Sequence, residues 1–297
     1  MDDTQQNLAS QSSKGYVQAA QPLRPLGQHG LTASAFFAPA LRADLQALYD
    51  TAAALRAVAN STNFVEETRE FLVDCIETAL TGAVPDAGGE PTEFTIAPLA
   101  LSNVQAEGRL DVQWGQRLVQ ATRRDIARPT CASWSDLMLY CRYQAEPLGR
   151  AVLELHGVSD ADIERATDAL TASLLVLYLL RTAGHDWRLF GRCYMPTDWI
   201  AEAGGSPEQL IEQHSSPALQ VVKQRMLERV NHLLTLAAPL PTLVTSPRLK
   251  AEALRLLFIA QAQHALLQRH DPLARNLRLS AWRKAFYHLR AWWLAKR

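Results

Sequence analysis

The chain has 297 residues, of which 48% are hydrophobic, and this length suffices for one large buried core or two modest ones. Thirty basic and thirty acidic residues give a formal net charge of zero, which argues against nucleic acid as a partner. Four cysteines (75, 131, 141 and 193) lack CxxC spacing. We interpret them as reduced thiols of a cytoplasmic protein rather than as metal ligands.

The N-terminal part of the sequence begins with a stretch that has no clear hydrophobic periodicity. Residues 1–30 are rich in Gln, Ser and Gly and predict a flexible tail, whereas residues 31–297 predict a single helical domain. Leucines recur at three- and four-residue steps from Leu41 to Leu55, which is typical of an amphipathic helix. A second helix is predicted over 64–81 and a loop over 86–95, and the run Phe94–Ile96 is a candidate strand.

The remainder of the chain also has helical periodicity. Its longest apolar run, Leu174–Leu180, is far shorter than the ~20 residues of a bilayer-spanning helix. Residues 184–206 contain Gly and Pro and predict an irregular segment. Helices are predicted at 94–105, 109–127, 133–156, 159–183, 207–213, 217–237, 247–269 and 280–296. This order, without an internal repeat, predicts an all-α domain.

Five segments carry a resemblance that is more specific than the helical pattern. They are Asp125–Thr130 with Trp134 and Leu137 after it, Tyr140–Arg150, His185–Pro196, Arg248–Glu252 and Arg269–Ser280. In this order they resemble the squalene/phytoene synthase family, in particular the bacterial hopanoid-pathway squalene (hydroxysqualene) synthases that process presqualene diphosphate. The similarity extends from about Pro39 to Arg290. It implies an isoprenoid-synthase-type helical bundle around a central cavity.

The resemblance also implies a chemistry. Family members ionise a prenyl diphosphate, and Mg²⁺ neutralises the leaving group through carboxylate, phosphate and water oxygens. The carboxylates come from two DxxxD-type clusters, because a four-residue step places both on one helix face. In this chain the first cluster falls on Arg56, Ala57 and Asn60, none of which is a carboxylate. A register that recruits Asp50 instead would misplace the apolar stripe.

The second cluster is also degenerate. The positions that match the family pattern are Leu175, Tyr178, Arg181, Thr182 and Asp186. Only Asp186 is a motif acid, and the neutral hydroxyl of Thr182 contributes little against divalent charges. Because such electrostatic stabilisation is usually the largest catalytic term, the sequence predicts lost or impaired metal–diphosphate chemistry.

Several family positions are retained. The resemblance implies catalytic roles for Tyr140, Arg192 and Tyr194, substrate-binding roles for Arg128, Gly149, Thr182 and Asp186, and a metal-ligand role for Asp186 alone. Structural roles are the favoured alternative, in which Asp186 pairs with Arg188, Arg192 or a helix cap. His185 and Asp186 are not expected to form an acid/base dyad, because adjacent helical residues point about 100° apart.

The C-terminal residues 282–297 combine aromatic and basic side chains at helical spacing. This composition suits a helix on a membrane surface, where rings lie at the headgroups and bases meet anionic lipid. A helix packed on the bundle with a solvated basic face is the alternative. The predicted localisation is cytoplasmic, and the first interpretation adds peripheral attachment to the inner membrane face.

Three functional hypotheses follow. The first is a Mg²⁺-dependent transferase of the hopanoid route that converts presqualene diphosphate to hydroxysqualene or squalene. The second is a non-catalytic pseudoenzyme that binds a prenyl lipid or a partner synthase of the same pathway. The third is an assembly factor, by analogy with complex I assembly factors that look like this family and also lack the acid clusters.

Overall fold

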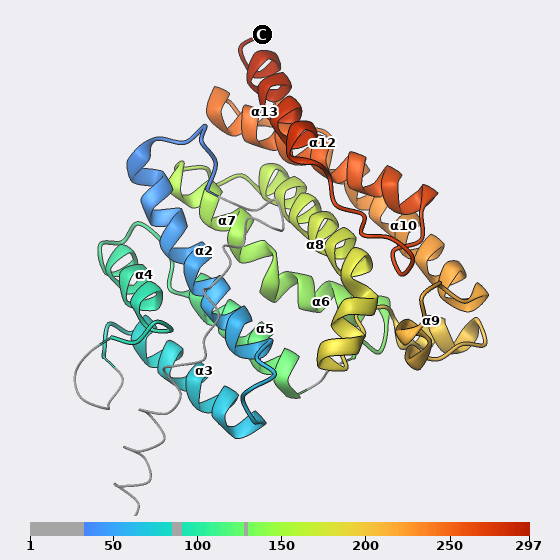
Figure 1. Cartoon of the computed structure of the whole chain (residues 1–297). Helices are drawn as coiled ribbons and strands as arrows, with labels where there is room; N and C mark the ends of the chain where they lie inside the picture. Colours follow the sequence, from blue (N-terminus) through green and yellow to red (C-terminus); the bar gives the residue numbers. More distant parts are fainter. Residues whose placement is uncertain (1–32, 85–90, 128–129) are drawn as a thin grey trace, which may run out of the picture.

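The computed structural model describes residues 33–84, 91–127 and 130–297, and these form a bundle of helices (Figure 1). The predicted tail at 1–30 lies outside the described residues. The α-helices are α2 Pro39–Ala59, α3 Glu66–Leu80, α4 Ile96–Ala106, α5 Gln113–Ala127, α6 Trp134–Gln144, α7 Glu146–Leu155, α8 Ala161–Phe190, α9 Thr197–Glu202, α10 Pro217–Ala237, α11 Leu240–Leu243, α12 Pro247–Arg269 and α13 Ala281–Ala295. A 3₁₀ turn, η2, covers Pro207–Ile211. The all-α prediction is confirmed.

Helix α8 lies at the centre of the bundle and packs against α6, α7, α10 and α12. The carboxylate of Asp160 caps its first turn by accepting hydrogen bonds from the backbone N–H groups of Asp162 and Ile163. Gly191, in the left-handed conformation with φ 61°, ends it. Among the described helices, α8 is the one long and apolar enough to cross a membrane, but 78% of its apolar window is buried inside the bundle. That burial accounts for its apolarity.

Helix α2 forms the opposite wall of the interior, and it packs against α4, α5 and α7. Its stripe of leucines is fully buried at Leu45, Leu48 and Leu55, as the spacing predicts. The C-terminal end of α2 lies close to the C-terminal half of α8, where Arg56 contacts the ring of Tyr178. These are the two helices on which the resemblance places the acid clusters.

Two predicted elements are wrong. The candidate strand Phe94–Ile96 is a turn that leads into α4, and the only β pairing in the described ranges is an isolated bridge between Thr130 and Cys193. The predicted irregular segment begins too early, because α8 continues through Gly184 to Phe190. A Cβ at Gly184 would lie 2.6 Å from Leu273 Cδ2 and 3.1 Å from the carbonyl oxygen of Leu210. This glycine therefore permits close packing and does not end the helix.

The predicted helix over 133–156 is divided into α6 and α7 at Ala145. Pro147 is the physical cause, because a proline inside a helix removes a backbone donor and clashes with the preceding turn. Gly149 lies beyond this break, where a Cβ would come within 2.7 Å of Thr171 Cγ2 and 2.8 Å of Thr167 Cγ2. The bend therefore comes from the proline, and the glycine lets α7 approach α8.

Candidate functional site

A buried network centred on Asp125 of α5 gathers most of the retained polar residues. Its carboxylate accepts hydrogen bonds from the hydroxyl of Tyr140 at 2.8 Å and from the hydroxyl of Tyr194 at 2.9 Å. The two tyrosine rings lie 5.2 Å apart. Burial raises the pKa of the Asp125 carboxyl, and the charge of Arg192 and the hydroxyl of Tyr140 oppose this shift. Burial likewise raises the pKa values of both tyrosines, which therefore remain neutral donors.

Arg192, directly after the glycine that ends α8, joins three parts of the chain. Its Nη1 donates to Asn60 Oδ1 at 2.6 Å, its Nη2 to the carbonyl of Ala59 at 2.7 Å, and its Nε to the carbonyl of Asp125 at 3.1 Å. Asn60 is one of the first-cluster positions that lack a carboxylate. Arg192, which the family pattern retains, thus donates a hydrogen bond to Asn60, which replaces one of the family's acids.

Arg56 lies in the last turns of α2. Its place in the site agrees with the alignment that puts the first acid cluster on Arg56, Ala57 and Asn60 and leaves Asp50 outside the site. Its guanidinium carbon lies 5.4 Å from the ring centre of Tyr178, and its Nε is buried without a hydrogen-bond partner among the described residues. Burial disfavours the cation, but the oxygens of Tyr178, Tyr140, Tyr194 and Asp125 outweigh this and raise the pKa of Arg56. A permanent positive charge therefore stands where the family pattern has a metal-binding acid.

Asp50 lies on another side of α2, where its carboxylate accepts a hydrogen bond of 2.7 Å from Gln46 at an exposed position.

On α8, Asp186 is buried and accepts a hydrogen bond of 2.7 Å from the hydroxyl of Thr182. Burial raises the pKa of this carboxyl, and the Thr182 hydroxyl opposes the shift. The neighbouring His185 is exposed, so the two side chains point apart. The two candidate residues of α8 are thus brought together as partners of each other.

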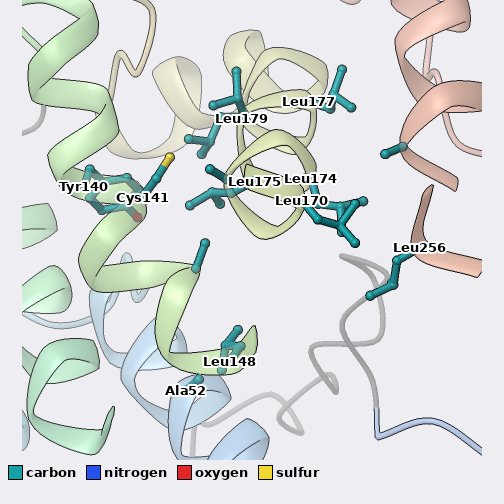
Figure 2. Close-up of a cluster of buried hydrophobic side chains, with 14 of the residues drawn as sticks. Ala52, Tyr140, Cys141, Leu148, Leu170, Leu174, Leu175, Leu177, Leu179 and Leu256 are labelled. Atoms are coloured by element: carbon teal, nitrogen blue, oxygen red, sulfur yellow. The ribbon is translucent and has the colours of Figure 1, made fainter. Parts of the chain in front are cut away.

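The other replaced positions of α8 are apolar, aromatic or cationic. Figure 2 shows Leu175 pointing toward α6, where Tyr140 and Cys141 lie. The ring of Tyr178 is contacted by both Arg56 and Arg181, and the guanidinium carbon of Arg181 is 5.1 Å from the ring centre. Arg181 is itself largely desolvated, and this burial lowers its pKa. At these positions α8 therefore presents packing side chains and a cation in place of carboxylates.

The space enclosed by the polar network is very small. It measures about 10 Å³ and is lined by Arg56, Ala59, Asn60, Thr122, Asp125, Gln144, Leu179, Asp186, Arg192 and Tyr194. That is about the room one water molecule requires. Mg²⁺ prefers octahedral oxygen coordination through carboxylates, phosphates and water. Within the described ranges no three His, Cys, Asp or Glu residues gather around a common point. The donor set therefore does not fit Mg²⁺.

Gly149 does not belong to this network. It lines a separate apolar pocket of about 50 Å³ between α7, α8 and α12, together with Leu148, Leu170 and Leu256. Small-molecule sites commonly measure roughly 300–1,000 Å³. These two narrow spaces share no lining residue.

A wider hollow, about 530 Å³, lies elsewhere, along α5, α6, α7 and α8. Its charges pair with one another, as in the 2.6 Å contact of Arg150 with Asp168 and the 3.7 Å contact of Arg117 with Glu146. These pairs leave no unbalanced charge for a diphosphate.

Arg128 lies outside the described residues, so its predicted substrate-binding role stays a prediction. Two contributors were not assigned site roles from the sequence. Asp125 was noted only as a match, and Asn60 only as a lost acid. A signal for Asn60 was available, since an amide can accept from a nearby arginine as a carboxylate does.

Comparison with known proteins decides the family. The sequence profile described as squalene/phytoene synthase matches residues 27–285. The chain belongs to the squalene/phytoene synthase family. A hydroxysqualene synthase of Rhodopseudomonas palustris is 35% identical over 162 residues, which cover 54% of this chain and 55% of that protein. The match thus spans about half of that relative's length.

A second relative covers more of the chain. The hydroxysqualene synthase of Zymomonas mobilis is 27% identical over 247 residues, 82% of this chain and 80% of that protein. Among solved structures, squalene synthase HpnC of Alicyclobacillus acidocaldarius aligns with a TM-score of 0.66 at 22% identity, over 90% of this chain and 95% of its own. A dehydrosqualene synthase in complex with a ligand aligns with a TM-score of 0.67 at 16% identity, over 99% and 97%. These structures show the fold.

Proposed function

We propose that this squalene/phytoene synthase family member acts in squalene or hopanoid biosynthesis without ionising a diphosphate unaided, as a non-catalytic partner subunit of a synthase of the same pathway. The observation that carries the proposal is the buried guanidinium of Arg56 between α2 and α8. A cation at this position repels Mg²⁺, whereas diphosphate ionisation in the family requires divalent ions to neutralise the leaving group.

A partner role is preferred to storage of a prenyl lipid. The polar space has room for about one water molecule, and the apolar pocket measures about 50 Å³. A farnesyl chain would require α7, α8 and α12 to move apart. The similarity to hydroxysqualene synthases supports the pathway, and the closed interior supports an action through the surface.

The test is a Mg²⁺-dependent turnover assay with farnesyl diphosphate or presqualene diphosphate, in which organic products are identified by mass spectrometry. The chain is assayed alone and together with an intact presqualene diphosphate synthase. We expect no product from the chain alone and an altered yield with the synthase. Hydroxysqualene or squalene from the chain alone, abolished in the Asp186→Asn variant, would overturn the proposal.

Thermal unfolding gives an independent readout. A ligand that binds the folded state and not the unfolded chain raises Tm, by an amount that grows with the ratio of its concentration to its Kd. We expect Mg²⁺ with inorganic diphosphate to leave Tm unchanged in the wild type. A rise in Tm that requires both would show that the site binds a metal–diphosphate complex despite Arg56.

A further inference from the structure

The C-terminal helix α13 exposes an apolar stripe that the bundle leaves uncovered. Trp282 is 86% exposed and Leu289 is 67% exposed, and Phe286 and Trp293 are also exposed. At 100° per residue these four positions fall within an arc of about 60°. Ala291 and Ala295, on the opposite side of the helix, are buried against the bundle. Exposed aromatic residues in one row differ from the single apolar residues scattered over an ordinary surface.

The inner face holds the helix firmly in place. The ring of Phe36 stacks on His288 with ring centres 4.0 Å apart and on Trp292 at 5.6 Å. Tyr287 packs 6.0 Å from Phe258 of α12, over which the guanidinium of Arg290 also lies. Figure 1 shows α13 lying along α12 at one edge of the molecule. The stripe is therefore preformed and requires no folding step before it can bind.

Charge is distributed very unevenly between this end and the rest of the chain. Residues 272–297 contain seven Lys and Arg and no Asp or Glu, so residues 1–271 hold 23 bases against 30 acids. Arg283, Arg290 and Arg297 follow one edge of the stripe at seven-residue steps. Burial and the charges of Arg181, Arg278 and Arg255 lower the pKa of Lys284, which indicates that cations crowd this end.

We propose that α13 docks on the surface of a bilayer that contains anionic lipids. Trp282, Phe286, Leu289 and Trp293 enter the boundary between headgroups and acyl chains, and the flanking arginines contact lipid phosphates. Tryptophan suits this boundary, since its ring is apolar and its N–H remains hydrated. The negative remainder of the molecule is repelled by the same surface, so the helix is presented in one orientation. The inference is independent of the proposed partner role.

Flotation of the full-length protein with vesicles tests the proposal. One set of vesicles is phosphatidylcholine alone, and the other is phosphatidylcholine mixed with phosphatidylglycerol. We expect binding to the second set only, a blue shift of tryptophan fluorescence on binding, and weaker binding at high salt, because salt screens the attraction. Equal binding to both sets would overturn the electrostatic part of the proposal.

Matched variants locate the contact. Phe286→Ser with Trp293→Ser should lower the partition coefficient at least about tenfold, since two large apolar side chains no longer insert. Arg283→Glu with Arg297→Glu should lower it about tenfold or more for anionic vesicles. Phe71→Ser removes an equally exposed ring, 61% exposed, from α3 and should leave binding unchanged.

Circular dichroism melting shows whether each variant is folded. If the folded α13 variants bind vesicles as tightly as the wild type, the proposal is overturned. A failure to bind vesicles together with concentration-dependent self-association that Phe286→Ser abolishes in light scattering would also overturn it, because α13 would then face a second copy of the chain.

Discussion

The retained and the replaced positions of the family site lie in one buried region but behave differently. The retained side, Asp125, Tyr140, Arg192 and Tyr194, forms a hydrogen-bond network in which each side chain has a partner. On the replaced side, Arg56 and Tyr178 contribute charge and ring packing, and Arg56 keeps a buried Nε without a partner among the described residues. Side chains that align with functional family positions can therefore be held by structural contacts alone, even after the metal ligands are lost.

The largest expected effect on stability comes from a substitution of Asp125, at the centre of the hydrogen-bond network of the retained positions. Asp125→Ala removes the acceptor of two tyrosine hydroxyls and a carboxylate that interacts electrostatically with the guanidinium groups of Arg56 and Arg192. We expect the free energy of unfolding to fall by about 3–5 kcal/mol, measured by urea denaturation. Asp125→Asn keeps one acceptor oxygen and should lose less. A loss below about 1 kcal/mol for Asp125→Ala would show that the network does not hold the helices together.

Removal of one donor from the same network should have a smaller effect. Tyr194→Phe deletes the hydroxyl that lies 2.9 Å from Asp125 and should cost about 1.5–3 kcal/mol, since the acceptor is a buried carboxylate. A double-mutant cycle with Asp125→Asn should give a coupling energy of about 0.5–3 kcal/mol. Strict additivity in the cycle would argue against a direct interaction.

Gly149 is the retained position outside the network, and its effect should come from packing alone. Gly149→Ala places a methyl group against Thr167 and Thr171, at less than 3.0 Å from a methyl carbon of each. Overpacking of this kind costs about 1–3 kcal/mol. Adding Thr167→Ser and Thr171→Ser removes both methyl groups and should restore most of the loss. Absence of rescue would point to a backbone requirement for glycine instead.

The smallest expected effect concerns Asp186, the surviving motif acid. Burial raises its pKa in the folded state, so the folded protein binds a proton more readily than the unfolded chain does. This group therefore lowers stability as the pH rises from 3.8, the ordinary pKa of an aspartate, through the folded-state pKa. Asp186→Asn should slightly raise Tm at neutral pH, and the gain should vanish below pH 3.8.

Tm measured as a function of pH for both proteins checks this expectation. A loss of stability in Asp186→Asn at neutral pH would show that the carboxylate is favoured in its charged form and holds a cation.

The fold was largely predictable from local patterns. The leucine spacing of α2 depends on neighbours within a few residues and is present as expected, and the Asp160 carboxylate that caps α8 acts over the same short range. The predicted end of the central helix at residue 183 is too early, because Gly184 packs closely on Leu273 and the carbonyl of Leu210, which are distant in sequence. Pro147 is a sequence signal for the division between α6 and α7, but the prediction of one helix over 133–156 does not include it.

The candidate site was predictable only in its chemistry. The absence of carboxylates at Arg56, Asn60 and Tyr178 is a matter of residue identity, and the sequence by itself determined it, together with the all-α class and the family. Tertiary structure alone decided that Arg192 pairs with Asn60, 132 residues away, and that Arg56 lies among three tyrosines and Asp125. The reason is physical. Hydrophobic periodicity and helix capping depend on residues within a few turns, whereas the surroundings of a buried charge depend on side chains that the whole fold brings together.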